Sequence, residues 1–185
     1  MSLRLFAALD VPDEVAAHAL RLMRGVPGAK WRPRENLHIT LRFFGDTPAP
    51  QAHDLDAELD QIAQSTPPFD IRLKGAGWFG KDEPHNLWLG LGESAPLHRL
   101  AGACEKAARR AGFKAEAGKF APHMTAAYLS ASNVALVQGF CTRLALFESA
   151  PWTVSGFSLM SSWRRDNAPS LYRAEAEYPL LGQSI

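Results

Sequence analysis

The chain has 185 residues, 46% of them apolar, and its 20 Lys and Arg nearly balance 19 Asp and Glu, for a net charge of +1. This length is typical of one domain with a substantial core, and the balanced charge excludes a uniformly basic surface for nucleic acid. No apolar run reaches the length of a membrane span, and residues 1–10 lack the apolar stretch of a signal peptide. We therefore expect a cytoplasmic protein that makes no membrane contact.

Strands and helices alternate along the whole chain. Apolar alternation predicts strands, and apolar residues at helical spacing between Pro and Gly boundaries predict helices. In chain order we expect a strand over 4–9, a helix over 12–23, a strand over 37–44, a helix over 51–64, strands over 69–73 and 87–91 joined by a Gly-rich connection, a helix over 96–111, a strand over 121–129, a helix over 134–147, and strands over 152–160 and 172–178. This order indicates the α/β or α+β class.

Two short motifs carry the chemistry of the sequence. His38 and Thr40 flank one apolar residue, and His123 and Thr125 flank another. Both motifs lie in predicted strands, where residues two apart project from the same face. An imidazole transfers protons near neutral pH, and a hydroxyl donates a hydrogen bond to an anionic oxygen. The two pairs therefore predict an acid, a base and two oxygen-binding hydroxyls, which suits acid–base chemistry at a phosphate.

The two motifs also indicate how the chain is organised. One such pair alone is common by chance and fits a hydrogen-bonded core pair, but the motif recurs, and helix–strand–helix–strand order recurs with it. We expect a single domain over residues 1–185, made of two similar lobes packed across a cleft. Strand alternation predicts that Arg42 shares a face with the first pair, which makes it a candidate substrate contact. Phe44 is a second candidate contact, since an aromatic ring can stack on a base.

Other chemistries have weaker support in the sequence. Two histidines and two hydroxyls are a poor donor set for zinc, which takes three or four His, Cys or carboxylate ligands. Cys104 and Cys141 form no CxxC pair, and no Ser lies in a GxSxG elbow. We expect both cysteines to be small buried thiols, and the site to need no metal and no cofactor. A metal-dependent hydrolase remains an alternative.

Basic and aromatic residues gather loosely around the two motifs. The basic ones are Lys30, Arg32, Arg34, Lys119, Arg164 and Arg165, and the aromatic ones, besides Phe44, are Trp31, Phe43, Trp78 and Phe79. For any one of these basic residues, a solvated surface position is the expectation. The aromatic residues could stack on a base, but core packing explains most of them equally well.

With both pairs placed, the sequence resembles the two-histidine phosphoesterases, and within them the bacterial 2′-5′ RNA ligase or RNA 2′,3′-cyclic phosphodiesterase family. The segments that carry the resemblance are RLFAAL at 4–9, KW at 30–31, ENLHITL at 35–41 with FG at 44–45, and FAPHMT at 120–125. The resemblance implies a bilobal α+β fold of two antiparallel sheets with outer helices, a central cleft and a pseudo-two-fold repeat. It implies that His38 and His123 are catalytic and that Thr40 and Thr125 bind the phosphate.

The resemblance also implies an activity, namely hydrolysis of an RNA terminal 2′,3′-cyclic phosphate to a 2′-phosphate. With an RNA 5′-hydroxyl in place of water, the same site would form a 2′-5′ linkage without ATP. Relatives often have Arg three residues after the second Thr, where this chain has Tyr128. We expect a monomer that acts on RNA 3′ ends or small cyclic nucleotides. The alternatives are another small cyclic phosphodiester as substrate and a non-catalytic RNA-end binder, and either histidine could be the base.

Overall fold

The computed structural model describes residues 2–130 and 133–183. In chain order its elements are β1 (Ser2–Asp10), α1 (Asp13–Leu22), β2 (Lys30–Trp31), a 3-10 turn η1 (Arg34–Asn36), β3 (His38–Pro48), α2 (Ala49–Ser65), β4 (Phe69–Ile71), β5 (Leu73–Phe79), β6 (Asn86–Leu91), α3 (Ala95–Arg110), β7 (His123–Tyr128), α4 (Val134–Arg143), β8 (Trp152–Val154), β9 (Gly156–Arg165) and β10 (Ala168–Pro179). Helices and antiparallel strands are mixed, which confirms the α+β class.

The strands form two antiparallel sheets. The larger has eight strands in the order β10-β9-β1-β3-β7-β6-β5, with β2 paired to β7, and the smaller joins β4 to β8. The two halves of the large sheet meet at β3 and β7, where one residue pair, Ile39 with Met124, joins the strands. The expected bilobal arrangement therefore appears as a sheet that almost divides along its middle, with one motif on each side of the division.

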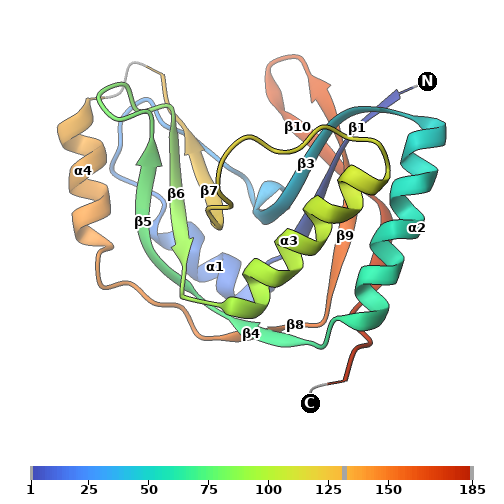
Figure 1. Cartoon of the computed structure of the whole chain (residues 1–185). Coiled ribbons are helices and arrows are strands. Elements are labelled where there is room, and N and C mark those ends of the chain that lie inside the picture. Colours follow the sequence, from blue (N-terminus) through green and yellow to red (C-terminus); the bar gives the residue numbers. More distant parts are fainter. Residues whose placement is uncertain (1, 131–132, 184–185) are drawn as a thin grey trace.

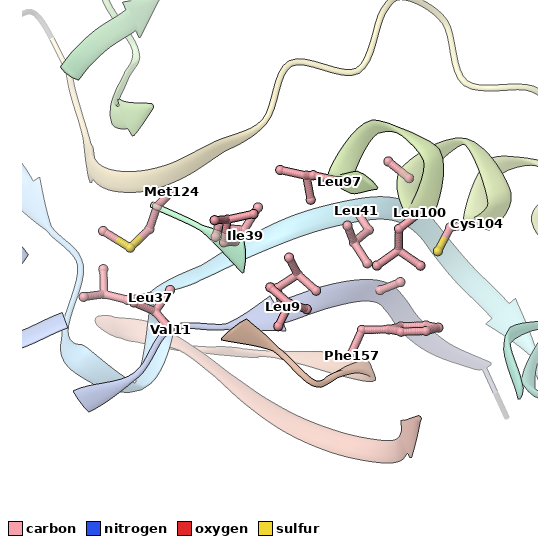
Figure 2. Packing of buried hydrophobic residues seen from close by; sticks show 14 of the residues in the cluster. Leu9, Val11, Leu37, Ile39, Leu41, Leu97, Leu100, Cys104, Met124 and Phe157 are labelled. Carbon is pink, nitrogen blue, oxygen red and sulfur yellow. The ribbon is translucent and has the colours of Figure 1, made fainter. Parts of the chain in front are cut away.

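The helices flank the sheet (Figure 1). α2 and α3 pack against each other and against β3, whereas α4 packs against β5 in the other half. A continuous apolar cluster joins both halves, and Ile39 and Met124 lie fully buried within it (Figure 2). Burying side chains of this size stabilises the fold by about 1.5–3 kcal/mol each. Because a slip of one residue would expose both, their burial sets the register of β3 and leaves the neighbouring His and Thr on the opposite face.

The elements differ from the sequence-based expectation in three places. The Gly-rich connection is itself a strand, β5, in which a Cβ at Gly77 would lie 2.3 Å from the ring of Trp88 on β6. The helix after residue 133 ends at Arg143, because the chain then turns so that the Phe147 carbonyl accepts a hydrogen bond from β5. The expected strand over 152–160 is broken at Ser155, since β8 pairs with β4 while β9 pairs with β1.

A β-bulge in β3 changes which residues face the motifs. Thr40 and Arg42 pair with adjacent residues of β1, so Leu41 between them has no partner on that strand. Leu41 and Arg42 are consequently both buried, and Phe43 is exposed. The prediction that Arg42 shares a face with Thr40 is therefore wrong, because the bulge shifts the alternation by one residue and brings Phe43 to that face instead.

Among the described residues, no helix is both long enough and apolar enough to cross a membrane.

Candidate active site

The single residue pair that joins β3 to β7 brings the two motifs together. In an antiparallel pair, the residues before one partner lie opposite those after the other, so the register places His38 across from Thr125 and Thr40 across from His123. Directly opposite residues have Cβ atoms about 4.5–5.5 Å apart. Each histidine therefore lies beside the threonine of the other motif, and one cluster holds all four side chains.

Two hollows open around the threonines of this cluster, and a third, which of the four side chains only His38 lines, holds Asp10, Glu35 and Glu177. His38, Thr40 and Thr125 line the first, which has a volume of about 280 Å³. Thr40 and His123 line the second, which has a volume of about 630 Å³. Since Thr40 borders both, the two hollows adjoin at the cluster, at the place where the sequence predicts a cleft.

The two imidazoles are oriented in the same way. His38 Nδ1 donates to the Asn36 carbonyl at 2.9 Å, and His123 Nδ1 donates to the Ala121 carbonyl at 2.8 Å. In each case the acceptor is the carbonyl two residues earlier, and because a carbonyl only accepts, the proton is assigned to Nδ1. Each motif thereby fixes its own tautomer and leaves Nε2 to accept or deliver a proton.

Aromatic rings hold both imidazoles in place. The centroid of the His38 ring lies 5.0 Å from Phe6 and 5.3 Å from Tyr172, with the tyrosine edge-on. The His123 ring meets Phe79 edge-on with 5.0 Å between centroids. Such packing restricts rotation of the imidazoles and removes water from their surroundings.

Burial changes the protonation of one histidine. The pKa of His38 is lowered from 6.5 to about 4, mainly because burial removes the imidazole from water. The bond to the Asn36 carbonyl and the charge of Asp10 oppose this shift, and the charges of Arg32 and His123 contribute to it. His38 is therefore neutral at neutral pH. Because its Nδ1 carries the proton, its Nε2 lone pair is available as a base.

The two hydroxyls are also arranged to act on a ligand. Thr40 Oγ1 lies 3.1 Å from His38 Nε2, and because that nitrogen carries no proton, the hydroxyl donates to it. Thr125 Oγ1 accepts a hydrogen bond from Asn86 Nδ2 at 3.4 Å, which leaves its own proton to be donated. An anionic oxygen held between the motifs can therefore accept directly from Thr125, and it can accept from Thr40 once that hydroxyl turns away from His38 Nε2.

The two hollows differ in charge. Of the described residues that line the first, three are arginines, Arg4, Arg32 and Arg164, and none is Asp or Glu. The second hollow mixes both signs, with Arg42 and Lys119 beside Glu105 and Glu116. The first hollow therefore has the more positive potential and favours an anion.

The structure separates the predicted contacts Arg42 and Phe44 from the first hollow. Arg42 lines the second hollow, where its guanidinium donates to Glu105 and Glu116, at 2.5 Å in each case. Phe44 is buried, and its ring centroid lies 5.4 Å from that of Phe113. Neither residue borders the first hollow.

Several site residues did not stand out in the sequence. Tyr172 and Phe6 come from distant strands and lie outside the two His-x-Thr motifs, and Arg32 is one of several basic residues near the first motif. Of the aromatic candidates, Phe43 and Phe79 do line the second hollow. Trp31 instead packs against Phe140, and the indole of Trp78 donates to the Lys81 carbonyl. Aromatic character alone did not distinguish these positions.

Residues 2–130 and 133–183 contain no group of three or more His, Cys, Asp or Glu that could hold a metal ion. The donors gathered at the cluster are two imidazoles and two hydroxyls, a poor set for zinc.

An antiparallel α+β fold whose two central strands each present a His-x-Thr motif to one cluster defines the two-histidine phosphoesterase class. The sequence model of the 2′-5′ RNA ligase superfamily matches residues 11–166, and the chain belongs to this family. This match confirms the resemblance drawn from the motifs.

Relatives and solved structures agree with this assignment. A protein of Archaeoglobus fulgidus named RNA 2′,3′-cyclic phosphodiesterase is 31% identical over 135 residues, which cover 71% of this chain and 75% of the relative. A Thermus thermophilus protein of the same name is 29% identical over 193 residues, covering 98% and 92%. The crystal structure of TT0787 from Thermus thermophilus has a TM-score of 0.83 at 25% identity, covering 98% and 100%. Escherichia coli LigT shares the fold, with a TM-score of 0.80 at 23% identity, covering 98% and 99%.

Proposed function

We propose that this protein is an RNA 2′,3′-cyclic phosphodiesterase that opens a terminal 2′,3′-cyclic phosphate to a 2′-phosphate. The observation that carries this proposal is the cluster itself, in which His38 and the two hydroxyls border a hollow lined by arginines, and the identically oriented His123 borders the adjoining hollow. The names of the relatives supply the substrate class. An RNA end brings the negative charge that such a hollow favours.

In the proposed mechanism, His38 is the base. Its neutral imidazole takes a proton from water through Nε2 as the water oxygen bonds to phosphorus. His123, in its protonated form, delivers a proton through Nε2 to the 3′ oxygen as the bond from that oxygen to phosphorus breaks. The products are a 2′-phosphate and a 3′-hydroxyl, and the two histidines have exchanged protonation states.

Thr40 and Thr125 bind the two nonbridging oxygens in this mechanism. Negative charge on these oxygens grows as the five-coordinate phosphorus forms, and donors already in position stabilise that charge without reorganising. If an RNA 5′-hydroxyl takes the place of water, the same proton transfers produce a 2′-5′ linkage. This joining reaction needs no ATP, because the new bond from phosphorus to the 5′ oxygen replaces the existing bond from phosphorus to the 3′ oxygen.

We further infer that residues 1–185 form one domain that acts as a monomer in the cytoplasm. The apolar cluster that includes residues of both sheet halves supports a single domain. Cys104 and Cys141 are both free thiols, which fits a reducing compartment.

The test is incubation of the purified protein, in EDTA, with a short RNA that ends in a 2′,3′-cyclic phosphate. We expect a 2′-phosphate product, and a decrease of about 10²- to 10⁴-fold in kcat for His38→Ala and for His123→Ala. His53→Ala, which changes an exposed histidine on α2, serves as the control and should retain full activity. Binding without turnover would indicate an RNA-end binder. Neither binding nor turnover would indicate another cyclic phosphodiester, and activity lost only with the chelator would indicate a metal-dependent hydrolase.

A further inference from the structure

Arg32 is a buried cation without a matching anion. Only 8% of its surface is exposed, and within residues 2–130 and 133–183 no carboxylate lies within 4.0 Å of its guanidinium. Taking an unpaired charge out of water is costly, so buried arginines normally pair with a carboxylate. The structure does supply such partners to Arg42 on β3, which bonds to Glu105 and Glu116.

The position of Arg32 is fixed by its backbone and by two tyrosines. Its amide donates to the Ala126 carbonyl at 2.8 Å, directly after Thr125 on β7. Its guanidinium carbon lies 4.9 Å from the centroid of the Tyr128 ring, and Nη2 donates to the Tyr172 hydroxyl at 3.4 Å. A guanidinium has five N–H donors, and among the described residues this single long hydrogen bond engages one of them.

The free side of Arg32 faces the motifs. Arg32 lines the first hollow together with His38, Thr40 and Thr125. It is also close enough to His38 for its charge to lower the pKa of that imidazole. Arg4 and Arg164 border the same hollow but are less buried, so solvent screens their charges more strongly.

We propose, building on the proposed function, that Arg32 is the phosphate-binding cation of this site, and that its guanidinium donates to a nonbridging oxygen of the terminal phosphate. The ring of Tyr128 supports the guanidinium from one side, so Tyr128 acts by positioning Arg32. The phosphate lies between Thr40 and Thr125, and its negative charge pairs with the guanidinium of Arg32. A guanidinium suits this task because its planar donors match two phosphate oxygens at once.

The test compares the binding of inorganic phosphate, followed by the NMR signals of the histidine rings at constant ionic strength. A hydrogen bond from a buried charged group predicts a Kd about 10- to 100-fold higher for Arg32→Gln than for the unchanged protein. Arg32→Lys keeps the charge but loses the planar donors that match two phosphate oxygens. Its Kd should lie between those of Arg32→Gln and the unchanged protein. The matched control is Arg34→Gln, two residues away, whose guanidinium pairs with Asp13 and does not border the hollow.

Turnover of the cyclic-phosphate RNA then separates this inference from the proposed function. We expect Arg32→Gln to lower kcat/KM and to move the acidic limb of its pH profile upward, because the charge that opposes protonation of His38 is gone. Unchanged phosphate affinity in Arg32→Gln and Arg32→Lys, or no binding to the unchanged protein, would overturn the role of Arg32 even if the RNA is hydrolysed. Phosphate binding that depends on Arg32, without hydrolysis of the RNA, would support Arg32 and overturn the proposed activity.

Discussion

The two His-x-Thr motifs have the same local geometry and different surroundings. In both, Nδ1 donates to the carbonyl two residues earlier and an aromatic ring packs against the imidazole. The hollow that His38 shares with Thr40 and Thr125 is lined by arginines, whereas the hollow that His123 borders holds paired charges of both signs. The repeated motif therefore orients the two histidines, while residues outside the repeat give them different electrostatic surroundings.

The strongest test of the difference between His38 and His123 is the pH dependence of the reaction. If His38 is the base, the acidic limb of kcat/KM should fall near pH 4, well below the ordinary histidine value. His38→Ala should abolish that limb and reduce kcat about 10²- to 10⁴-fold, and His123→Ala should reduce kcat similarly while leaving the acidic limb in place. Steady-state rates from pH 3.5 to 9 measure both. An acidic limb that survives in His38→Ala would reverse or remove the assignment.

Arg32 and Arg42 differ in that, among the described residues, only Arg42 is paired with carboxylates of the protein, and this difference can be tested. Arg42 has its carboxylate partners within the protein, so Arg42→Gln should lower the free energy of unfolding by about 2–3 kcal/mol by leaving Glu105 without its partner. Urea unfolding measures this loss. Arg110→Gln is the control, since Arg110 pairs with Glu58 on the surface and should cost at most about 1 kcal/mol. Equal losses in the two variants would contradict a structural role for Arg42.

The packing behind His123 can be disturbed without touching either motif. Gly77→Ala would place a methyl group 2.3 Å from the ring of Trp88, whose centroid is 6.1 Å from that of His123. We expect a loss of about 1–3 kcal/mol in stability and a lower kcat as the ring shifts. Gly139→Ala in α4 meets no atom within 4 Å and should raise stability by about 0.5–1 kcal/mol. Thermal unfolding and kcat for both variants test this, and an unchanged kcat in Gly77→Ala would show that Trp88 does not position His123.

The lowered pKa of His38 also predicts a pH dependence of stability. The unfolded chain protonates this residue near pH 6.5, whereas the native protein does so only near pH 4. Between these values the unfolded state binds more protons, so stability falls as the pH falls, by at most about 1.4 kcal/mol per pH unit from this group. Urea unfolding at pH 5 and pH 7 should therefore show a smaller difference for His38→Gln than for the unchanged protein. His53→Gln, on the exposed side of α2, should keep the full difference.

Much of the fold could be predicted from local patterns. Apolar periodicity located most helices and strands, because that pattern reflects which face each element buries. This periodicity was wrong where non-local contacts determine the secondary structure. β5 is rich in glycine and was expected to be a connection, but it forms a strand because β6 pairs with it. The break at Ser155 has the same origin, since the partners of β8 and β9 lie far apart in the sequence.

For the site, the sequence by itself determined which four side chains form the cluster, because a strand places His and Thr two residues apart on one face wherever that strand lies. The tertiary structure alone decided the rest. Burial of Ile39 against Met124 set the register that joins the motifs, and a bulge turned Arg42 inward and Phe43 outward. The low pKa of His38 and the unpaired charge of Arg32 depend on burial and on neighbours from distant strands. These are energies of packing and desolvation, which arise only when the chain has folded.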